Sequence, residues 1–456
     1  MKQILNLKIE KMAMGGFGIA YAEGKAIFVP CTAVGDIVDI DITVEKKDYA
    51  YGKVKKYISC SDSRVEVKCP SFVAEIPCGG CDWLMLKYSE QLKQKNQLLL
   101  ELFSPFIDKA LIYFPAPSPQ IKHYRNKVFM PVGKNIQTGK ITFGMYARFS
   151  HQIVEHITCE NHPPIFDQLA NSLMEFCLKA KVEPYNEIEH RGQLRYIGFR
   201  CNSDGSQILV ILVTLSGKLP FTNLLVKKLT TEFSPIKGII QNINRQKGNV
   251  ILGKETKLLY GSENLYDNLC GLKFRVNYRS FWQINTGTME MIIFFLQDFV
   301  NIKDVILDAY CGIGAIGLSL ADKVQRVILL EEFPQAIEDA KENAALNKIK
   351  NVSFITGKVE DHLADILKKE KPDTIILDPP RSGIQQNALE AIMQAEVKQI
   401  IYLSCAPMTL ARDLNTLLSG EKYKVVFLQP FDMFPNTWHI ECLAVLKHKD
   451  YYINMR

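Results

Sequence analysis

Short apolar runs alternate with amphipathic stretches over the last third of the chain. The apolar runs have the length of strands, and the segments between them place apolar residues at helical spacing. The strand-like runs cover residues 304–310, 326–332, 352–357, 373–380 and 398–405. Buried strands that alternate with helices form a parallel sheet covered on both faces. The pattern therefore predicts a doubly wound α/β domain over residues 276–456.

The last two strand-like runs differ from those before them, because no helix separates them. Residues 424–434 and 439–449 are joined only by a short turn. Strands joined so closely pair as antiparallel neighbours. We therefore expect an antiparallel hairpin to close the parallel sheet.

The first 58 residues show short alternating strands that are interrupted by glycine. This pattern predicts a small β-barrel of the kind that binds oligonucleotides. Lysines and tyrosines are interleaved at its end, at Lys46, Lys47, Tyr49, Tyr51, Lys53, Lys55, Lys56 and Tyr57. That composition suits contact with phosphates and unpaired bases, and a solvated basic face is the alternative explanation.

Residues 59–275 mix helices and strands and are interpreted as a central α+β domain. The segment opens with several cysteines and continues with a helical pattern near residues 88–105. Apolar runs at residues 206–215 and 237–244 predict strands. A chain of 456 residues is too long for one hydrophobic core, which agrees with a division into three domains.

The composition is typical of a globular protein without a membrane partner. Hydrophobic residues make up 47% of the chain and charged residues 23%, and no apolar run reaches the roughly 18 residues of a membrane span. The first residues lack the apolar core of a secretory signal. We therefore expect a cytoplasmic protein, monomeric by default. Its formal net charge of +6 permits a polyanionic partner but does not require one.

A glycine-rich turn follows the first strand of the α/β domain. Gly312, Gly314 and Gly317 satisfy the pattern G-x-G-x-x-G. Such a turn lets a ligand approach the backbone closely, whether the ligand is a dinucleotide or S-adenosylmethionine. Glu331 ends the next strand, where its carboxylate could accept hydrogen bonds from a ribose.

The loop after the fourth strand distinguishes between these two cofactors. It reads Asp378-Pro-Pro-Arg381 and lies at the carboxyl edge of the sheet, where ligands bind. Hydride-transfer enzymes do not need this loop. Together with the closing hairpin it favours a class I methyltransferase, and Arg381 in place of an aromatic residue disfavours methylation of an exocyclic amine.

Cys405 ends the strand that follows this loop. A thiolate there could attack carbon 6 of a uracil, which makes carbon 5 nucleophilic toward a methyl donor. Removal of the carbon 5 proton then needs a base. His439 and Glu441, at the start of the final strand, could each serve. The simpler interpretation is a buried cysteine and an ordinary salt-bridging glutamate.

These motifs resemble the bacterial RNA (uracil-5-)-methyltransferases, in particular the iron–sulfur branch that methylates 23S ribosomal RNA. The sequence GGFGIAYAEGKAIFVPCTAVGDIV matches the TRAM domain, the RNA-binding barrel of that family. SFWQIN, DAYCGIGAIGL, LDPPRSG, YLSCAPMTLARDL and FPNTWHIE match its catalytic domain in order and spacing. The resemblance implies a class I, Rossmann-like domain that methylates carbon 5 of uridine with S-adenosylmethionine. It also implies that the helix near residues 88–105 packs on the catalytic domain.

The resemblance implies roles for individual residues. Cys405 falls on the nucleophile, Glu441 on the base, and Phe281 on the aromatic residue that stacks on the flipped uracil. The positions expected to contact S-adenosylmethionine, with the glycine turn included, are Gln283, Tyr310, Gly312, Gly314, Glu331 and Asp378. One departure is Ala315, where some members have a cofactor-binding asparagine.

Four cysteines fall on positions that hold a four-iron four-sulfur (4Fe-4S) cluster in that branch. Cys69, Cys78 and Cys81 have the spacing C-x8-C-x2-C, and Cys159 follows later. The first interval is longer than the usual C-x5-C, which loop-closure entropy tolerates. Zinc and unligated thiols are the alternatives, and Cys60 is a possible substitute ligand. A cluster here would be structural or would position RNA.

Two other functions match parts of the pattern. A cytosine-5 methyltransferase also uses a cysteine, but the FPNTWHIE sequence argues against it. A non-catalytic RNA-binding protein is opposed by the intact Cys405 and Glu441. Within the family, 23S ribosomal RNA is the expected substrate and transfer RNA is the alternative.

Overall fold

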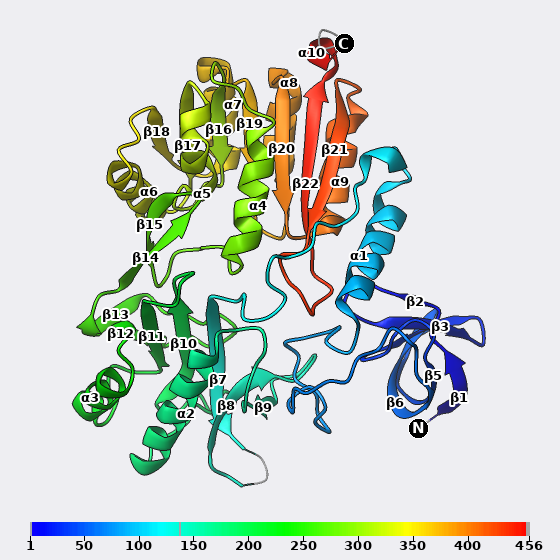
Figure 1. Ribbon diagram of the computed structural model, residues 1–456, viewed down its shortest axis with the longest axis vertical. Coiled ribbons are helices and arrows are strands. Elements are labelled where there is room, and N and C mark those ends of the chain that lie inside the picture. The colour runs from blue at the N-terminus through cyan, green and yellow to red at the C-terminus, as the bar shows by residue number, and fades with distance from the viewer. Residues whose placement is uncertain (1, 136–137, 453–456) are drawn as a thin grey trace.

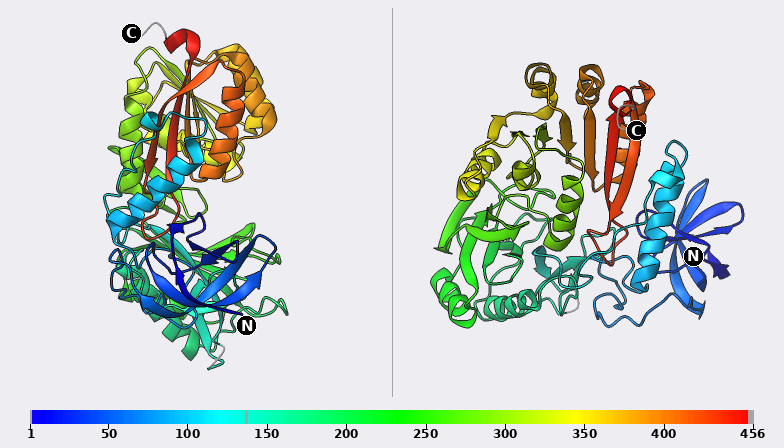
Figure 2. Two further views of the ribbon diagram at one scale, coloured as in Figure 1. Left: turned by 90° about the vertical axis from the view of Figure 1, so that its right-hand side faces the viewer. Right: turned by 45° about the horizontal axis from the view of Figure 1, so that its top comes forward.

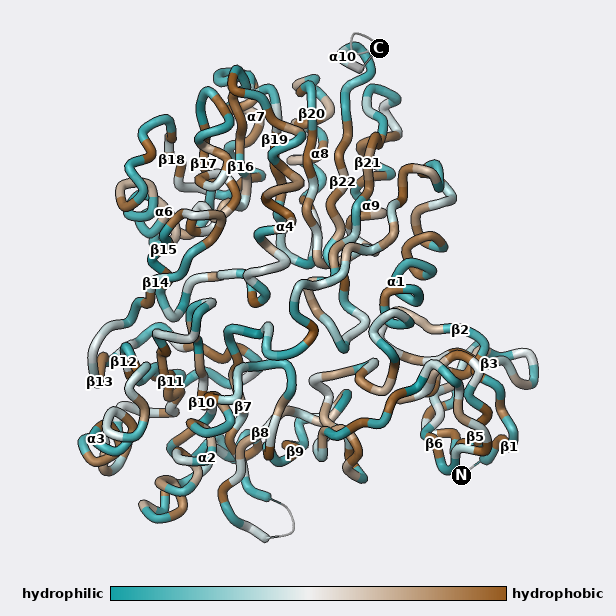
Figure 3. Tube along the Cα trace, viewed as in Figure 1, coloured by the Kyte–Doolittle hydropathy of each residue, from teal (hydrophilic) through white to brown (hydrophobic). Residues whose placement is uncertain are grey.

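The computed structural model describes residues 2–135 and 138–452. Its strands form an N-terminal six-stranded sheet, two seven-stranded sheets and one separate hairpin. Figure 1 shows the C-terminal sheet above the central one, with the N-terminal sheet beside them. The tube in Figure 3 is mostly brown along the strands of both large sheets, as expected of strands with covered faces. None of the helices in the described part of the chain is long and apolar enough to cross a membrane.

The N-terminal strands close on a small apolar core of their own. They follow the order β1-β5-β6-β4-β3-β2, and buried side chains such as Leu7, Ile27 and Ile40 fill the interior. Alternate residues of β5 are buried, as the two-residue period of a strand requires. The strands are β1 (Gln3–Lys8), β2 (Lys11–Met12), β3 (Gly18–Ala22), β4 (Lys25–Val29), β5 (Ile37–Glu45) and β6 (Tyr49–Ser59).

A single helix, α1 (Tyr88–Phe103), connects the N-terminal region with the C-terminal sheet. Its residues Leu99 and Phe103 are fully buried in one of the two cores of the C-terminal domain. Lys95 on the same helix is buried and forms an ion pair of 2.6 Å with Asp432, which is also buried. The right-hand view of Figure 2 shows α1 standing between the barrel and the last strands of the sheet.

The central domain is a mixed sheet with two helices on one face. The strand order is β13-β12-β11-β10-β7-β8-β9, and every residue of β10 and β11 is buried. The strands are β7 (Lys127–Lys134), β8 (Ile141–Tyr146), β9 (Ile153–Glu155), β10 (Leu194–Cys201), β11 (Ile208–Thr214), β12 (Ile236–Ile243) and β13 (Glu255–Gly261). The helices are α2 (Pro164–Lys179) and α3 (Thr222–Glu232), and the short turn η1 (Lys109–Leu111) precedes them.

The C-terminal sheet confirms the predicted parallel sheet with its closing hairpin. Its strand order is β18-β17-β16-β19-β20-β22-β21, in which only β22 and β21 pair antiparallel to their neighbours. The strands are β16 (Val305–Ala309), β17 (Arg326–Glu331), β18 (Val352–Thr356), β19 (Thr374–Leu377), β20 (Gln399–Ser404), β21 (Tyr423–Phe431) and β22 (Glu441–His448).

Helices cover both faces of this sheet, so its strands are apolar throughout. One core contains residues of α4, α5 and α6, and the other contains residues of α1, α7, α8 and α9. The elements are α4 (Thr286–Gln297), α5 (Ala315–Ser319), η2 (Ala321–Lys323), α6 (Pro334–Leu346), α7 (Val359–Glu370), α8 (Gln386–Ala395), α9 (Pro407–Ser419) and α10 (Lys449–Tyr452).

The hairpin of β14 (Asn264–Leu269) and β15 (Leu272–Asn277) joins the two large domains. The backbone amide of Arg275 donates a hydrogen bond of 2.7 Å to the side chain of Asn343 on α6. The boundary expected after residue 275 therefore falls inside β15. We propose to group the whole hairpin with the C-terminal domain.

Candidate active site and cysteine cavity

The glycine turn after β16 opens a pocket at the carboxyl edge of the C-terminal sheet. Tyr310, Gly312 and Gly314 have positive φ angles of 65°, 55° and 84°, so the chain reverses sharply before α5. Gly317 lies on α5 itself, where a Cβ atom would stand 2.5 Å from Leu329. The glycine there allows the helix to pack directly on β17.

Several of the predicted cofactor residues line this strand-end pocket. Gln283, Tyr310, Gly312 and Asp378 are among its walls, and so is Phe281, whose side chain is 68% exposed. The remaining lining residues are Trp282, Met289, Asp308, Cys311, Ile313, Ala315 and Ile316. The pocket thus gathers residues from the loop before α4, the glycine turn and the loop after β19.

Glu331 is not among the residues that line the pocket, but it fixes the backbone of the glycine turn. Its Oε2 accepts a hydrogen bond of 3.0 Å from the backbone amide of Gly312, and its Oε1 accepts one of 3.0 Å from the amide of Phe333. The predicted ribose-binding carboxylate therefore also fixes the glycine turn. Gly314 contributes to the backbone of that turn and is not among the residues that line the pocket.

Asp308 is a pocket residue that sequence reasoning did not single out. It is fully buried near the end of β16, and burial raises the pKa of its carboxyl to about 8. Its Oδ2 accepts a hydrogen bond of 2.8 Å from the amide of Gly317, whereas Oδ1 has no hydrogen-bond partner among the described residues. The sequence signal was available, because the aspartate directly precedes the glycine turn in DAYCGIG.

Cys405 directly follows β20, and Glu441 begins the adjacent antiparallel strand β22. The pairing of Ser404 with Cys442 puts Cys405, the next residue, beside Glu441 at the same end of the sheet. Glu441 is 1% exposed, and its Oε1 has no hydrogen-bond partner within the described ranges. Burial, followed by the neighbouring charge of Asp378, raises the pKa of Glu441 well above its ordinary value.

Neighbouring charges also act on the thiol of Cys405. Burial and then Glu441 raise the pKa of Cys405, whereas the positive charge of Arg381 and its hydrogen bond to the thiol lower it. Burial also raises the pKa of Asp378 to about 7. Cys405, Glu441, Asp378 and Arg381 thus form one electrostatically coupled cluster next to the strand-end pocket.

His439 differs from Glu441 in its surroundings. Burial, together with the positive charges of Arg381, Lys95 and Arg125, lowers the pKa of His439 to about 4. Its ring lies against Trp438, with 4.2 Å between ring centroids. The imidazole is therefore neutral at pH 7 and is held by aromatic contact.

A second cavity brings together the four predicted metal-ligating cysteines. Cys69, Cys78, Cys81 and Cys159 all line it, although Cys159 is far from the others in sequence. Cys60 is exposed and is not among its lining residues. We call this site the cysteine cavity.

Polar groups approach the sulfur atoms of the cysteine cavity from several sides. The amide of Gly80 donates to Cys78 Sγ at 3.3 Å, and Asn161 Nδ2 donates to Cys81 Sγ at 3.1 Å. Burial raises the pKa of Cys78 to about 11. Burial opposes ionisation of Cys159, but the hydrogen bond and charge of His162, together with backbone hydrogen bonds from Asn161 and His162, lower the pKa of that thiol.

The spacing of the sulfur atoms bears on which metal would fit. In the described part of the chain, the group His156, His162 and Asp167 is the only one whose potential ligand atoms all lie within 4.8 Å of one another. No three of the cysteine sulfurs meet that limit. Tetrahedral zinc with bonds of about 2.3 Å would need sulfurs about 3.8 Å apart. In an iron–sulfur cluster each thiolate binds its own iron, so the sulfurs stand farther apart.

His156, His162 and Asp167 have a sufficient structural explanation without a metal. The Nε2 atoms of both histidines lie 2.7 Å from the same oxygen of Asp167. These contacts hold His162 in place against Cys159. The triad therefore forms part of the wall of the cysteine cavity.

Two family models match the chain. The model described as tRNA (Uracil-5-)-methyltransferase covers residues 87–449. The chain belongs to this family. A second model, the TRAM domain of tRNA (uracil(54)-C(5))-methyltransferase, covers residues 5–52, which contain β2 to β5, most of β1 and the start of β6. The N-terminal sheet is accordingly a TRAM barrel.

Relatives in this family align over nearly their whole length. An RNA methyltransferase of Oceanobacillus iheyensis, named as uncharacterized, is 35% identical over 98% of this chain and 97% of its own. A protein of the same description from Clostridium tetani is 36% identical over 97% of this chain and 96% of its own. The chain is therefore an RNA methyltransferase that aligns with nearly the full length of these relatives.

A solved structure supports the same classification. The Pyrococcus abyssi tRNA (uracil-54, C5)-methyltransferase, in complex with S-adenosyl-L-homocysteine, superposes with a TM-score of 0.76. The two sequences are 25% identical, and the match covers 98% of this chain and 100% of that one. The enzyme is thus an S-adenosylmethionine-dependent RNA (uracil-5-)-methyltransferase by family and by fold.

Proposed function

We propose that this protein methylates carbon 5 of one specific uridine in 23S ribosomal RNA, through a covalent bond between Cys405 and carbon 6. The observation that supports this most strongly is the pairing of Cys405 with Glu441 beside the strand-end pocket. A nucleophile and a base next to a cofactor pocket are what this reaction requires.

The strand-end pocket suits a cationic methyl donor. S-adenosylmethionine supplies an electrophilic methyl group on a positively charged sulfur. Gln283, Tyr310 and Asp378 would hold it, with Glu331 near the ribose. The free Oδ1 of buried Asp308 is an acceptor without a partner in the described structure, and a cationic or N–H group of the ligand would satisfy it.

The reaction uses Cys405 first and Glu441 last. The Cys405 thiolate adds to carbon 6 of uracil, and the electrons of the 5,6 double bond move toward the carbonyl oxygen at position 4 as an enolate. Carbon 5 of this enolate attacks the methyl group of S-adenosylmethionine, whose bond to the sulfonium sulfur breaks, so that S-adenosylhomocysteine leaves. Glu441 then removes the proton from carbon 5, the double bond forms again, and the carbon–sulfur bond breaks to release the thiolate.

His439 is better suited to a supporting role than to the role of base. Its lowered pKa of about 4 makes it a weak base at neutral pH. The raised pKa of Glu441 makes that carboxylate the stronger proton acceptor of the two. Phe281 is largely exposed at the mouth of the pocket, and its ring is available to stack on a base turned out of its helix.

The cysteine cavity fits a 4Fe-4S cluster better than zinc. Four thiols line one cavity, and among the described residues no three of their sulfur atoms lie within 4.8 Å of one another, as three ligands of one tetrahedral zinc ion would. Cys69, Cys78, Cys81 and Cys159 would hold the cluster. Methyl transfer needs no redox step, so the cluster would stabilise the central domain or position RNA.

Transfer RNA is the second candidate substrate. The names of the family model and of the solved Pyrococcus abyssi enzyme both refer to transfer RNA. The set of four cysteines, by its resemblance to the iron–sulfur branch, is what favours ribosomal RNA.

Mapping of 5-methyluridine by mass spectrometry tests this choice. A strain that lacks the gene is compared with one that carries it on a plasmid, and ribosomal and transfer RNA are analysed separately. We expect the loss of one 5-methyluridine from 23S ribosomal RNA and its return with the plasmid. Loss from transfer RNA alone would replace the proposed substrate, and no loss from either would contradict the proposed reaction.

A further inference from the structure

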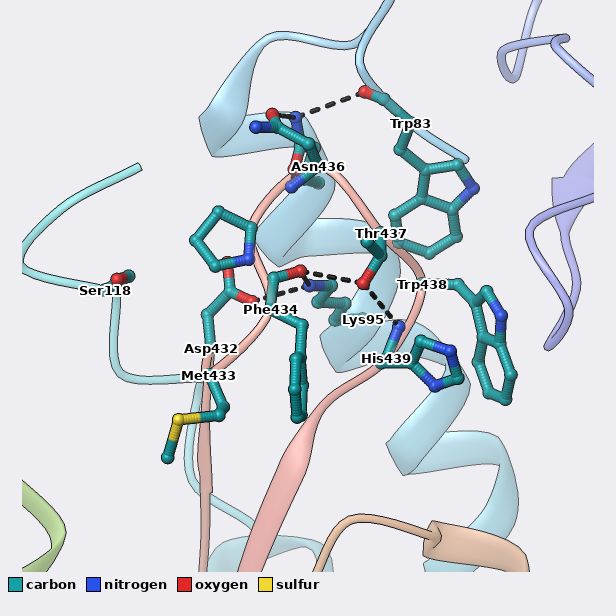
Figure 4. Close-up of polar contacts among 12 residues, drawn as sticks. Trp83, Lys95, Ser118, Asp432, Met433, Phe434, Asn436, Thr437, Trp438 and His439 are labelled. Carbon is teal, nitrogen blue, oxygen red and sulfur yellow. Dashed lines mark hydrogen bonds and ion pairs between the residues drawn. The ribbon is translucent and has the colours of Figure 1, made fainter. Parts of the chain in front are cut away.

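The loop between β21 and β22 carries His439 and leads directly into Glu441. It is buried for most of its length, and Asn436 at its centre has a positive φ of 68°. For a residue other than glycine, such a backbone conformation persists only when surrounding contacts favour it. Figure 4 shows this loop, which we call the base loop (residues 432–440), folded against α1 and Trp83.

The main chain of Asn436 is held by the segment that follows Cys81. The backbone amides of Asp82 and Trp83 both donate to the carbonyl oxygen of Asn436, each at 3.0 Å. In return, Gln91 on α1 accepts a hydrogen bond of 2.8 Å from the amide of Asn436. The conformation of the base loop therefore depends on where residues 81–83 lie.

The side chain of Asn436 makes a second connection to the same cysteine. Its Nδ2 donates to Asn161 Oδ1 at 3.0 Å, and Asn161 Nδ2 donates to Cys81 Sγ at 3.1 Å. Asn436 is 7% exposed and Asn161 is 4% exposed, so water competes little for these bonds. Cys81 is thus joined to the base loop through its neighbours in sequence and through this pair of amides.

Contacts at either side of Asn436 fix the rest of the loop, and one of them, a hydrogen bond of 3.4 Å from the amide of Trp438 to Asp82 Oδ2, also ends beside Cys81. Lys95 forms the buried ion pair with Asp432 and donates to the carbonyl of Phe434 at 3.3 Å. Tyr124 donates through its hydroxyl to the carbonyl of Pro435 at 3.0 Å. Asn436 differs from these residues because its side chain is joined through Asn161 to the sulfur atom of Cys81 itself.

From this geometry we propose that Asn161 and Asn436 are positioning residues, which transmit the placement of Cys81 to the base loop and so to Glu441. The proposal rests on the proposed function, because it assigns the base to Glu441. Its consequence is that ligation of Cys81 supports proton removal at a site in another domain. Neither asparagine touches the substrate, and both act through the backbone of the base loop.

Asn436→Gly tests the link at the loop. Glycine tolerates the positive φ, so the backbone is retained while the side-chain amide is removed. Because small displacements of a catalytic group cost up to about 100-fold in rate, we expect kcat to fall on the order of tenfold or more. KM for RNA, the affinity for S-adenosylmethionine and the iron content should stay the same. A methylated adduct on Cys405 should accumulate, since the slow step is now proton removal.

Asn161→Asp tests the other end of the link. A carboxylate at position 161 still accepts the hydrogen bond from Asn436 but can no longer donate to Cys81 Sγ. We expect a similar fall in kcat with the same accumulation of adduct. The double variant Asn161→Asp, Asn436→Gly should be no slower than the slower single variant, because both changes break one chain of contacts.

Asn387→Ala is the matched control. Asn387 is exposed on α8, lines neither cavity and donates one hydrogen bond of 3.1 Å to the carbonyl of Glu360. It should keep the wild-type kcat.

The outcomes separate the two proposals. The link would be overturned if the two substitutions lowered kcat independently, so that the fold-losses multiplied in the double variant. A wild-type kcat in Asn436→Gly would overturn it too. In both cases the wild-type enzyme would still form 5-methyluridine, and the proposed function would stand. Loss of iron from Asn161→Asp with an unchanged kcat would also overturn the link. Wild-type enzyme that forms neither 5-methyluridine nor an adduct would instead contradict the proposed function.

Discussion

The strand-end pocket and the cysteine cavity are built in opposite ways. The pocket draws much of its wall from the carboxyl ends of parallel strands and the loops that follow them, together with the start of α4. The cysteine cavity draws on the loop before α1, on strands of the central sheet and on the segment from residues 156 to 162. The position of the first follows from sheet topology. The position of the cysteine cavity depends on the conformation of long loops.

The two sites also differ in the charge that they favour. Burial raises the pKa of Asp308 to about 8 and that of Asp378 to about 7, so each carboxylate is stabilised by a cation in the pocket. In the cysteine cavity burial raises the pKa of Cys78 to about 11, and a metal ion is what deprotonates such a thiol. One site therefore suits a sulfonium ligand and the other suits a metal.

Loss of the nucleophile should have the largest effect. Cys405→Ala removes the group that activates carbon 5, so we expect methylation to fall by at least about 1,000-fold. The affinities for RNA and S-adenosylmethionine should be nearly unchanged, because the pocket and the barrel remain. Incorporation of labelled methyl groups and equilibrium binding measure the two effects. Substantial residual methylation would show that Cys405 is only a buried thiol.

Substitution of a predicted metal ligand in the cysteine cavity should have the next largest effect, on iron content and on stability. Anaerobically purified protein should be brown, with a broad absorbance near about 400 nm and about four iron atoms per chain. Cys78→Ser or Cys81→Ser should lose this absorbance and destabilise the central domain more than the C-terminal one, since metal binding contributes to folding. Cys60→Ser is the control and should keep the iron. Colourless wild-type protein with stoichiometric zinc would refute the assignment of the cluster.

The pH dependence of the rate tests whether Cys405 and Glu441 must both lose a proton before they act. Burial raises the pKa of both Cys405 and Glu441, and both must lose a proton to act. The value of kcat/KM should therefore rise with pH, by about tenfold per unit where one of the two groups titrates and by up to about 100-fold per unit below both pKa values. Arg381 lowers the pKa of Cys405, so Arg381→Gln should move this limb to higher pH. An unchanged limb would show that another group controls the rate.

The barrel should give the smallest effect. Lys53 and Lys55 are exposed on β6, and removing one lysine–phosphate interaction should reduce the slope of log affinity against log salt by about 0.7 for single-stranded RNA. The double variant Lys53→Ala, Lys55→Ala should therefore lose about 1.4 from this slope, whereas Lys179→Ala on α2 should leave the slope unchanged. Equal slopes in wild type and double variant would mean that these lysines form only a solvated face.

The sequence predicted the parts of the structure that depend on local pattern. The apolar runs predicted the strands of the C-terminal sheet, and the glycine turn predicted the pocket near Tyr310 and Gly312. The missing helix between β21 and β22 predicted the hairpin that brings Glu441 beside Cys405. In each case neighbouring residues determine the outcome.

The contacts between domains could not be predicted in this way. Asn161, Asn436 and Lys95 are ordinary polar residues in the sequence, and their roles arise only when three distant segments meet. Family resemblance, and no local pattern, pointed to Cys159 as a partner of Cys81. The role of Asp308 in the pocket was not predicted, because the sequence alone does not distinguish an aspartate that contacts a ligand from one that only supports the glycine turn.

The adduct formed by Glu441→Gln tests the central claim most directly. The variant is incubated with substrate RNA and S-adenosylmethionine, separated on a denaturing gel, digested and analysed by mass spectrometry. If Glu441 removes the carbon 5 proton, a methylated uridine should remain bonded to the peptide that contains Cys405, and His439→Ala should slow the reaction without trapping it. An adduct that accumulates with His439→Ala and not with Glu441→Gln, or a bond to any other residue, would contradict this account.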